Sequence, residues 1–330
     1  MASFTVYKLH FTSPLHIGDN RLDYSISMKT IQSDTLYAAV TSCLAMQGIP
    51  IPEGGDLGCT ISSLFPFYQK DKQAEAVYFF PKPLKNTLPL DNIRYTKKIK
   101  KVAWLDKGYF ERMIQGKTQL EGKSVIDDVR NEFLTSRPIP EKFIVSEVMP
   151  RVTVSRTGEE DVVPFYMDRV YYKDYSGLYF LVQGDTSLLD KGLELLQHQG
   201  LGTDRNVGNG SFVYDTDTLK LGCPEQADNA VALSLFIPEN REELALMMEG
   251  ENVAYDFVRR GGWITTPPHL TMRKNVVYAF TPASVFHVEG VAVPFCKGIT
   301  VDLNPHVKGL DTVEHPIWRN GKAIFVPIRF

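Results

Sequence analysis

Two stretches far apart in the chain carry the same pattern, a strand followed by a helix. In the first helix Leu36, Val40 and Leu44 fall on one face, as a 3.6-residue period requires. A strand, a helix, a long interruption and then strand, helix and strand is the order of a split βαβ, or ferredoxin-like, domain that carries an insertion. The elements are predicted at 4–11 and 33–48, and then at 178–183, 185–199 and 211–221.

A second unit is predicted after a polar connector at 223–229. Its apolar segments are bounded by Gly and Pro, as strands are. We therefore expect an α+β fold with two ferredoxin-like (RRM-like) domains in tandem: 1–222 with a large basic insertion at about 66–150, and a β-rich domain at 223–330. The second unit's strands are predicted at 230–237, 255–258, 276–280, 285–293 and 323–328, with a short helix at 240–248.

Composition excludes several classes of protein. The 330 residues include 36 Lys and Arg against 39 Asp and Glu, so no global positive field favours nucleic acid. The four cysteines form no CxxC pair, which predicts reduced thiols and no zinc site. No signal peptide precedes Leu15, and the uncharged run 35–52 predicts a buried helix and a turn instead of a membrane span. A cytoplasmic protein without membrane contact is expected.

Positive charge is concentrated in the predicted insertion. Residues 82–117 hold ten Lys or Arg and three acidic residues, whereas the other 294 residues hold 26 basic and 36 acidic ones. Trp104 and other aromatic residues are interleaved with these cations, a combination that grips phosphates and stacks unpaired bases. A solvated basic hairpin is the equally weighted alternative.

The glycine-rich segment 200–210 is the most specific local signal. Four glycines in eleven residues let a backbone approach a ligand and turn its N–H groups toward an anion, and Arg205 adds a planar fork for phosphate. It is no Walker loop, because Asn209 stands where Lys belongs, and no dinucleotide fingerprint, because Arg205 replaces the third Gly. A tight connector is the alternative.

Arg151 and Arg156 suit RNA contacts or, as is more usual near a strand end, surface salt bridges. The pair Arg259 and Arg260 and the pair Arg273 and Lys274 suit RNA, another subunit or solvent. His16 fits a general base or, more simply, a turn histidine bonded to the backbone. Ser33 and Asp34 are best explained as a helix cap. No paired-carboxylate or metal-ligand spacing is found, so neither a catalytic residue nor a cofactor is predicted.

Taken in order, these motifs resemble those of the RAMP superfamily of CRISPR proteins, and within it the family of the fourth subunit of the type III-A (Csm) effector complex. The insertion carries no matching motif. The segments that carry the resemblance are Leu15–Gly18, Ser33–Leu36, Arg151 with Arg156, the loop 200–210, Arg259–Trp263, Met272–Lys274, and His315-Pro316 with Arg319.

The resemblance implies a non-catalytic subunit that holds the repeat-derived 5′ tag of the guide RNA (crRNA) in a basic cleft. The implied partners are a large Cas10-type subunit, the backbone RAMP subunit and, through the complex, target RNA. A thumb hairpin is expected in the insertion, at Lys97, Lys98, Lys100, Lys101 and Trp104. The implied RNA-binding residues are His16, Ser33, Arg151, Arg156, Gly200, Gly202, Arg205, Asn206, Gly208, Gly210, Arg259, Arg260, Arg273 and Lys274.

Two positions depart from the family pattern. Ala283 precedes Ser284 where relatives usually have Gly, so the backbone there is expected to be built differently. Trp318 stands in place of a more usual Tyr.

Two other functions stay open. One is a metal-independent endoribonuclease that processes the guide precursor, with His16 as general base, although no second His or Tyr accompanies it in a recognisable motif. The other is a protein scaffold without RNA contact.

Overall fold

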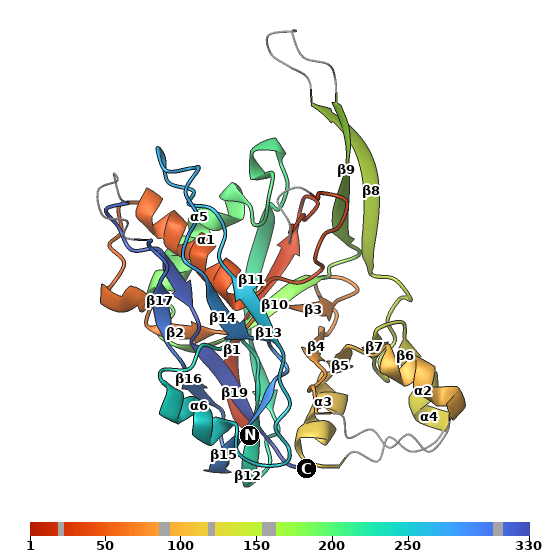
Figure 1. The fold of residues 1–330 in the computed structure, drawn as a ribbon. Coiled ribbons are helices and arrows are strands. Elements are labelled where there is room, and N and C mark those ends of the chain that lie inside the picture. The colour runs from red at the N-terminus through yellow and green to blue at the C-terminus, as the bar shows by residue number, and fades with distance from the viewer. Residues whose placement is uncertain (19–22, 86–92, 118–122, 154–162, 306–312) are drawn as a thin grey trace.

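The computed structural model describes the chain except residues 19–22, 86–92, 118–122, 154–162 and 306–312. A mixed sheet forms the centre of the first unit, and its strands pair in the order β11-β1-β10-β3-β4-β5-β7-β6, with β2 also pairing with β10 (Figure 1). The strands are β1 (Ala2–Phe11), β2 (Cys59–Ile61), β3 (Phe65–Tyr68), β4 (Val77–Pro81), β5 (Trp104–Asp106), β6 (Val129–Arg130), β7 (Phe133–Leu134), β10 (Gly177–Gly184) and β11 (Phe212–Leu221).

Two helices cover one face of this sheet: α1 (Ser33–Met46) and α5 (Ser187–Gln199). They approach closely, because a Cβ at Gly192 of α5 would lie 2.6 Å from Cγ1 of Val40. β1 is buried on both faces, since Tyr7 packs under the helices and Phe4 packs on the opposite side. The strands and helices predicted for the first unit outside its insertion are thereby confirmed, with ends shifted by one or two residues.

The second unit contains a sheet in the order β15-β12-β19-β16 and two ribbons, β13-β14 and β17-β18. One helix, α6 (Arg241–Met247), accompanies them among the described residues. The predicted helix at 240–248 is confirmed, and three short strands, β16 to β18, were not predicted. The strands are β12 (Ala227–Ala232), β13 (Phe257–Arg260), β14 (Val277–Phe280), β15 (Val285–Val291), β16 (Phe295–Lys297), β17 (Thr300–Asp302), β18 (Trp318–Asn320) and β19 (Ala323–Ile328).

The two units share one hydrophobic core. Val6 and Tyr179 of the first sheet belong to the same buried cluster as Val231 and Val326 of the second. Burial of apolar area across this boundary stabilises the arrangement of the units as well as each unit.

The insertion is not the expected basic hairpin. Residues 82–117 form α2 (Ile93–Lys100), the strand β5 and α3 (Lys107–Ile114), and β5 pairs with β4, so the segment widens the first sheet. α4 (Lys123–Asp127) follows. The helical spacing was obscured because half of the residues of α2 are Lys or Arg and because Gly108 lies inside α3.

A long hairpin projects instead from the next segment. β8 (Ile144–Thr153) pairs with β9 (Val163–Tyr172) over their full length, and the hairpin stands away from the body in Figure 1. Its exposed side chains include Val148, Val152 and Tyr166.

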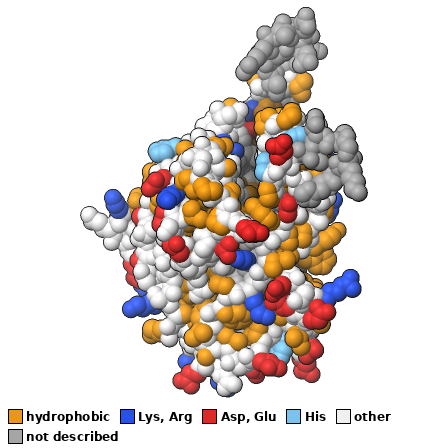
Figure 2. Space-filling model, turned by 90° about the vertical axis from the view of Figure 1, so that its left-hand side faces the viewer, with side chains coloured by type: hydrophobic (Ala, Val, Ile, Leu, Met, Phe, Trp, Pro, Cys, Tyr) orange, Lys and Arg blue, Asp and Glu red, His pale blue; other side chains and the backbone are white. Residues whose placement is uncertain are grey.

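In the part of the chain that the structure describes, no helix is long and apolar enough to cross a bilayer, and no group of three or more His, Cys, Asp and Glu has the geometry of a metal site. On the face seen in Figure 2, acidic and basic side chains are interspersed among hydrophobic ones. Positive charge is therefore not continuous over that face.

Candidate nucleic-acid interface

The glycine-rich loop between α5 and β11 is held against the segment that follows β1. Gly200, Gly202, Gly208 and Gly210 all have positive φ, a conformation that favours glycine. A Cβ at Gly202 would lie 2.5 Å from the His16 carbonyl oxygen. The Thr203 N–H donates to that carbonyl (2.9 Å). The glycines at both ends of the loop therefore serve close backbone packing.

The tip of the loop is free of such contacts. Arg205, Asn206 and Gly208 are exposed, and the short 3-10 turn η2 (Arg205–Val207) lies between two left-handed residues, Asp204 and Gly208. A Cβ at Gly208 would meet no atom within 4 Å. Alternation of left-handed and right-handed residues gives a backbone concavity of the kind that binds anions.

A buried amide lies next to this tip. Asn209 is 1% exposed, and its Nδ2 has no hydrogen-bond partner among the described residues. An unsatisfied buried N–H costs free energy, so a bound acceptor at the tip would be favoured.

His16 is a structural residue. It is 1% exposed, and its Nδ1 donates to the Asp168 carbonyl oxygen (2.7 Å) while the ring stacks on Tyr24 (5.8 Å between centroids). The predicted hydrogen bond of His16 to the backbone is therefore present, although His16 does not lie in a turn. Because the ring is enclosed, it does not present a base to a ribose hydroxyl.

The base of the β8–β9 hairpin adjoins the same place. Leu15 bridges to Val170 of β9, and the Tyr24 ring lies between His16 and Phe165. Arg151 is paired in register with Phe165 and so shares its face of the hairpin. Arg156 lies outside the described residues.

Arg169 is a residue that sequence reasoning missed. It lies on β9 opposite Glu147, and its Nε is buried with no partner among the described residues. Strand alternation between Val163 and Tyr172 would have placed Arg169 on the Phe165 face, had this segment been recognised as a strand.

Ser33 and Asp34 do not cap α1, contrary to the prediction. The N-cap is Gln32, without a side-chain cap bond. The Ser33 hydroxyl instead accepts from the Leu235 N–H (3.0 Å), and Ser33 is fully buried, which takes it out of reach of RNA.

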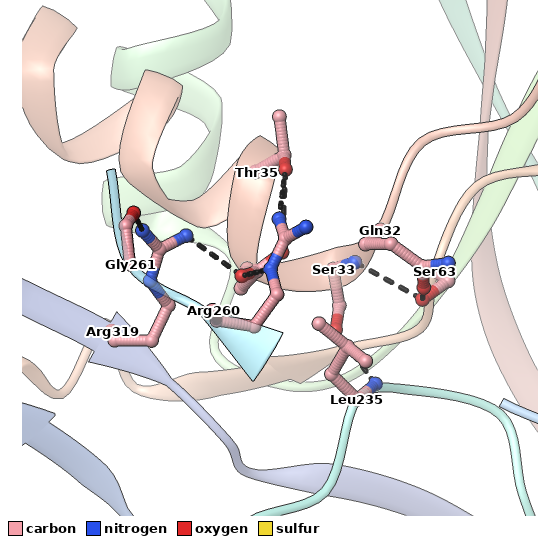
Figure 3. A network of polar contacts seen from close by, with 9 residues as sticks. Gln32, Ser33, Thr35, Ser63, Leu235, Arg260, Gly261 and Arg319 are labelled. Carbon is pink, nitrogen blue, oxygen red and sulfur yellow. Dashed lines mark hydrogen bonds and ion pairs between the residues drawn. The ribbon is translucent and has the colours of Figure 1, made fainter. Parts of the chain in front are cut away.

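Asp34 binds two arginines of the second unit, Arg260 and Arg319, which are labelled in Figure 3. Arg260 donates through Nε (2.7 Å) and Nη2 (2.8 Å) to the two carboxylate oxygens, and Arg319 donates through Nη1 (2.7 Å). Asp34 is fully buried. We call these three residues the Asp34 clamp. Arg260, expected to bind RNA, is thus occupied by an ion pair within the chain.

Lys274 lies beside the Asp34 clamp. Burial, together with the positive charge of Arg319, lowers the pKa of Lys274 to about 8, whereas Asp34 raises it. Two arginines and a lysine surround the single carboxylate of Asp34, so the site has an excess of positive charge that favours the binding of an anion. Arg259 is exposed on β13, and the exposed Arg273 guanidinium lies 4.8 Å from the centre of the Trp263 ring.

The thumb candidates lie elsewhere. Lys97, Lys98, Lys100 and Lys101 are exposed on and just after α2, at the opposite end of the molecule from the β8–β9 hairpin (Figure 1). Trp104 lies in β5 and packs on the core against Phe65 (5.9 Å), so it is not free to stack on a base.

Ala283 and Trp318, where the sequence departs from the family pattern, are also placed. Ala283 has a φ of +73°, so the left-handed backbone expected of glycine is kept with alanine, and the expectation of a different backbone was wrong. Trp318 packs beside Gly55. A Cβ on Gly55 would lie 2.9 Å from Cγ of Trp318.

Comparison with known proteins agrees with this architecture. Residues 225–328 match the model of the CRISPR Csm4 C-terminal domain. A curated relative, "CRISPR system Cms protein Csm4" of Thermococcus onnurineus (strain NA1), is 26% identical over an alignment 252 residues long, and the alignment covers 70% of this chain and 75% of the relative.

Solved structures agree over nearly the whole chain. A chain of the Csm3–Csm4 subcomplex of the type III-A interference complex superposes with a TM-score of 0.58 at 17% identity, covering 100% of both chains. A chain of a Csm1–Csm4 cassette in complex with pppApA gives a TM-score of 0.57 at 19% identity, covering 99% of this chain and 98% of that one. These two likenesses concern the fold.

The α+β fold of this chain is therefore the fold of the Csm4 chains in these solved structures. More narrowly, the C-terminal domain model and the curated relative make the chain a Csm4-like RAMP protein.

Proposed function

We propose that this chain is a non-catalytic RNA-binding subunit of a type III-A (Csm) CRISPR-Cas effector complex, acting in the cytoplasm in antiviral defence. It holds the repeat-derived 5′ tag of the crRNA between a large Cas10-type subunit and the backbone RAMP subunit. The single observation that supports this most is the exposed tip of the glycine-rich loop, mounted on backbone contacts that fix its position. Two ferredoxin-like domains, 1–222 and 223–330, are part of the proposal.

The tag phosphates bind at the loop tip and beside it. Arg205 supplies a guanidinium at the tip, and Arg151 and Arg169 supply two more from the adjacent hairpin. Guanidinium groups suit phosphate oxygens because they form paired hydrogen bonds. Lys274 and Arg273 extend the positive surface into the second unit, and Ser33 and Arg260 are not included because they are engaged internally.

The β8–β9 hairpin, and not the basic insertion, takes the role of the thumb. It projects from the body beside the glycine-rich loop and exposes Val148, Val152 and Tyr166. Apolar side chains on a projecting ribbon suit insertion between stacked bases, where they replace a base-stacking contact. Guide and target RNA then meet the chain at the same end as the tag.

A nuclease is disfavoured by the burial of His16, because a general base must reach the 2′-hydroxyl proton within hydrogen-bond distance. The role of His16 is to position the loop through its carbonyl oxygen, which accepts from both the Thr203 N–H and the Thr203 hydroxyl.

The test is RNA retention by the assembled complex. The chain is co-expressed with the other subunits and a repeat-spacer array, purified through a tag on this chain, and the protected RNA is sequenced. Affinity for tag RNA is then measured against salt for wild type, Arg205→Ala and Arg151→Ala. Each lost phosphate contact should flatten the log–log slope by about one unit.

Arg137→Ala is the matched control, because Arg137 is an exposed arginine that pairs only at the surface with Glu75. RNA with one defined repeat-derived 5′ end, together with slopes changed by Arg205→Ala and unchanged by Arg137→Ala, supports the proposal. Subunits recovered without RNA would favour the scaffold function, and precursor RNA cut by the chain alone would favour the nuclease.

A further inference from the structure

A buried carboxylate lies at the base of the β8–β9 hairpin. Asp168 of β9 is 5% exposed, and its carboxylate accepts two hydrogen bonds, one at Oδ2 from the Ser27 N–H (3.0 Å) and one at Oδ1 from the Ser146 hydroxyl (2.5 Å). Buried carboxylates are normally paired with cations, as Asp34 is, but no Lys or Arg among the described residues pairs with Asp168. The carboxylate instead joins β9 to β8 and to the segment before α1.

The backbone of Asp168 bonds to the body of the protein as well. Its N–H donates to the Tyr24 carbonyl oxygen (2.8 Å), and its carbonyl oxygen accepts from Nδ1 of His16 (2.7 Å). Among the described residues this is the outermost backbone contact between the hairpin and the body, because the bonds between Val170 and Leu15 lie closer to the base. Side chain and backbone of one residue therefore hold the hairpin at the point where it leaves the body.

The same contacts lead to the glycine-rich loop. The His16 carbonyl oxygen accepts from the Thr203 N–H (2.9 Å) and from the Thr203 hydroxyl (3.1 Å). Asp168 and Thr203 thus bond to one residue, Asp168 to its ring and Thr203 to its carbonyl oxygen. Because His16 is enclosed, it has little freedom to move between them. The base of the hairpin is therefore held in a fixed relation to the loop.

The direction of the hairpin at Asp168 determines where its exposed side chains lie. Val148 is the register partner of Asp168 and Tyr166 lies two residues away on β9, so both share the face of the hairpin that carries Asp168. The five residues from Asp168 to Val163 span about 17 Å, so a tilt of about 10° at Asp168 moves the Val163 end by roughly 3 Å. Figure 1 shows the hairpin standing away from the body beyond this point.

An RNA strand that contacts the loop and the hairpin together binds at two places on one chain. The second contact depends on an effective concentration, which is highest when the two places are held at the distance that the RNA spans. We propose that Asp168 is a positioning residue for RNA: it fixes the direction of the β8–β9 hairpin relative to the glycine-rich loop, so that one strand reaches both. The inference rests on the proposed function.

The experiment compares two synthetic RNAs on the full-length chain by fluorescence anisotropy. The short RNA is the repeat-derived tag alone, which reaches only the loop, and the long RNA continues from the tag into guide sequence and reaches the hairpin. Asp168→Ala removes both side-chain hydrogen bonds and leaves the backbone bond to His16 in place. It should weaken binding of the long RNA about tenfold, through a lower effective concentration, and leave the affinity for the short RNA unchanged.

Two further variants separate positioning from a general loss of stability. Asp168→Asn keeps both hydrogen bonds, because its carbonyl oxygen accepts from the Ser27 N–H and its amide donates to the Ser146 hydroxyl oxygen, so it should bind both RNAs as wild type does. Asp106→Ala is the matched control, since Asp106 is also 5% exposed and accepts from the Tyr109 N–H (2.8 Å) at the start of α3. It should lower the melting temperature without changing the affinity for either RNA.

Ser146→Ala is a milder variant, for use if Asp168→Ala does not fold. It breaks only the bond from β8 to the carboxylate and should also weaken binding of the long RNA selectively. Equal weakening of both RNAs in the alanine variants overturns the inference, and so does wild-type affinity for the long RNA. Weak binding of the long RNA that persists in Asp168→Asn overturns it as well.

Hydrogen exchange without RNA separates this inference from the proposed function. If wild type binds neither RNA, the proposed function fails. In that case the amides of β8 and β9 should still exchange faster in Asp168→Ala than in wild type, while the amides of the glycine-rich loop exchange as before. Unchanged exchange in the hairpin would show that Asp168 does not hold it in place.

Discussion

Asp34 is a residue whose removal should cost this chain considerable stability. It is fully buried, and Arg319, with a side chain only 10% exposed, depends on it for charge compensation. Asp34→Ala leaves two guanidinium groups facing each other without a carboxylate, and breaking a buried pair in this way costs roughly 3–5 kcal/mol. Urea unfolding followed by circular dichroism measures the change in the free energy of unfolding.

Asp56→Ala is the matched control for this prediction. Asp56 also pairs with a cation, Lys322 (2.7 Å), but both side chains are substantially exposed, at 51% and 32%. An exposed pair contributes about 0–1 kcal/mol. Equal losses in the two variants would mean that the Asp34 clamp has no special importance.

Replacement of Ala283 by glycine should stabilise the protein. It holds a φ of +73°, where an L side chain is strained, and its N–H donates to the Ala232 carbonyl oxygen (2.8 Å), which fixes this conformation. Ala283→Gly should raise the free energy of unfolding by about 0.5–1 kcal/mol, because relief of the strain exceeds the added freedom of the unfolded chain. An unchanged or lower melting temperature in differential scanning calorimetry would contradict this.

The lowered pKa of Lys274 should make the stability of the protein depend on pH. Its folded pKa of about 8 lies below the unfolded value of roughly 10.4. Between these values the unfolded chain binds the additional proton, so stability contributed by this residue rises with pH. Wild type should therefore gain stability relative to Lys274→Met from pH 8 toward pH 10. A difference between the two proteins that stays constant over this range, in urea titrations at each pH, would show that Lys274 titrates normally.

At the scale of elements, strong periodicity made the prediction possible. Helical spacing of apolar residues predicted α5, at Leu189, Leu193 and Leu196. β1 and β11 also have clear apolar patterns, because the side chains that face the core must be apolar. The β8–β9 hairpin escaped detection because it is mostly solvated and its exposed valines follow no burial pattern. The Asp34 clamp joins residues 226 and 285 positions apart, and no local pattern encodes such a pairing.

The locations of α2 and of the β8–β9 hairpin predict opposite effects on RNA. Neutralising the α2 segment with Lys97→Gln, Lys98→Gln, Lys100→Gln and Lys101→Gln should leave crRNA retention unchanged, because this segment lies far from the glycine-rich loop.

Tyr166→Ala on β9 should weaken target RNA binding. It should change the free energy of unfolding by less than about 0.5 kcal/mol, since Tyr166 is 62% exposed. Filter binding with labelled crRNA and with labelled target RNA measures both effects. Loss of crRNA in the lysine variant alone would return the RNA contact to the insertion.

At the scale of the whole molecule, the shared core predicts that the two units unfold together. Leu233, Val285 and Ile324 of the second unit are fully buried in the same cluster as Phe4 and Phe65 of the first. Cutting the chain at 222 would expose this apolar surface on both fragments, at about 25 cal/mol for each Å². Neither 1–222 nor 223–330 alone should reach the stability of the whole chain.

Calorimetry of the intact chain should therefore give one transition, with the calorimetric enthalpy equal to the van't Hoff enthalpy. Hydrogen exchange should show the amides of β1 and of β19 opening together, because both strands leave the same core when it is lost. Two resolved transitions, with the second unit surviving the loss of the first, would mean that the interface between the units contributes little. In that case the ion pairs of the Asp34 clamp would break before either core unfolds. Asp34→Ala would then change only the difference in temperature between the two transitions.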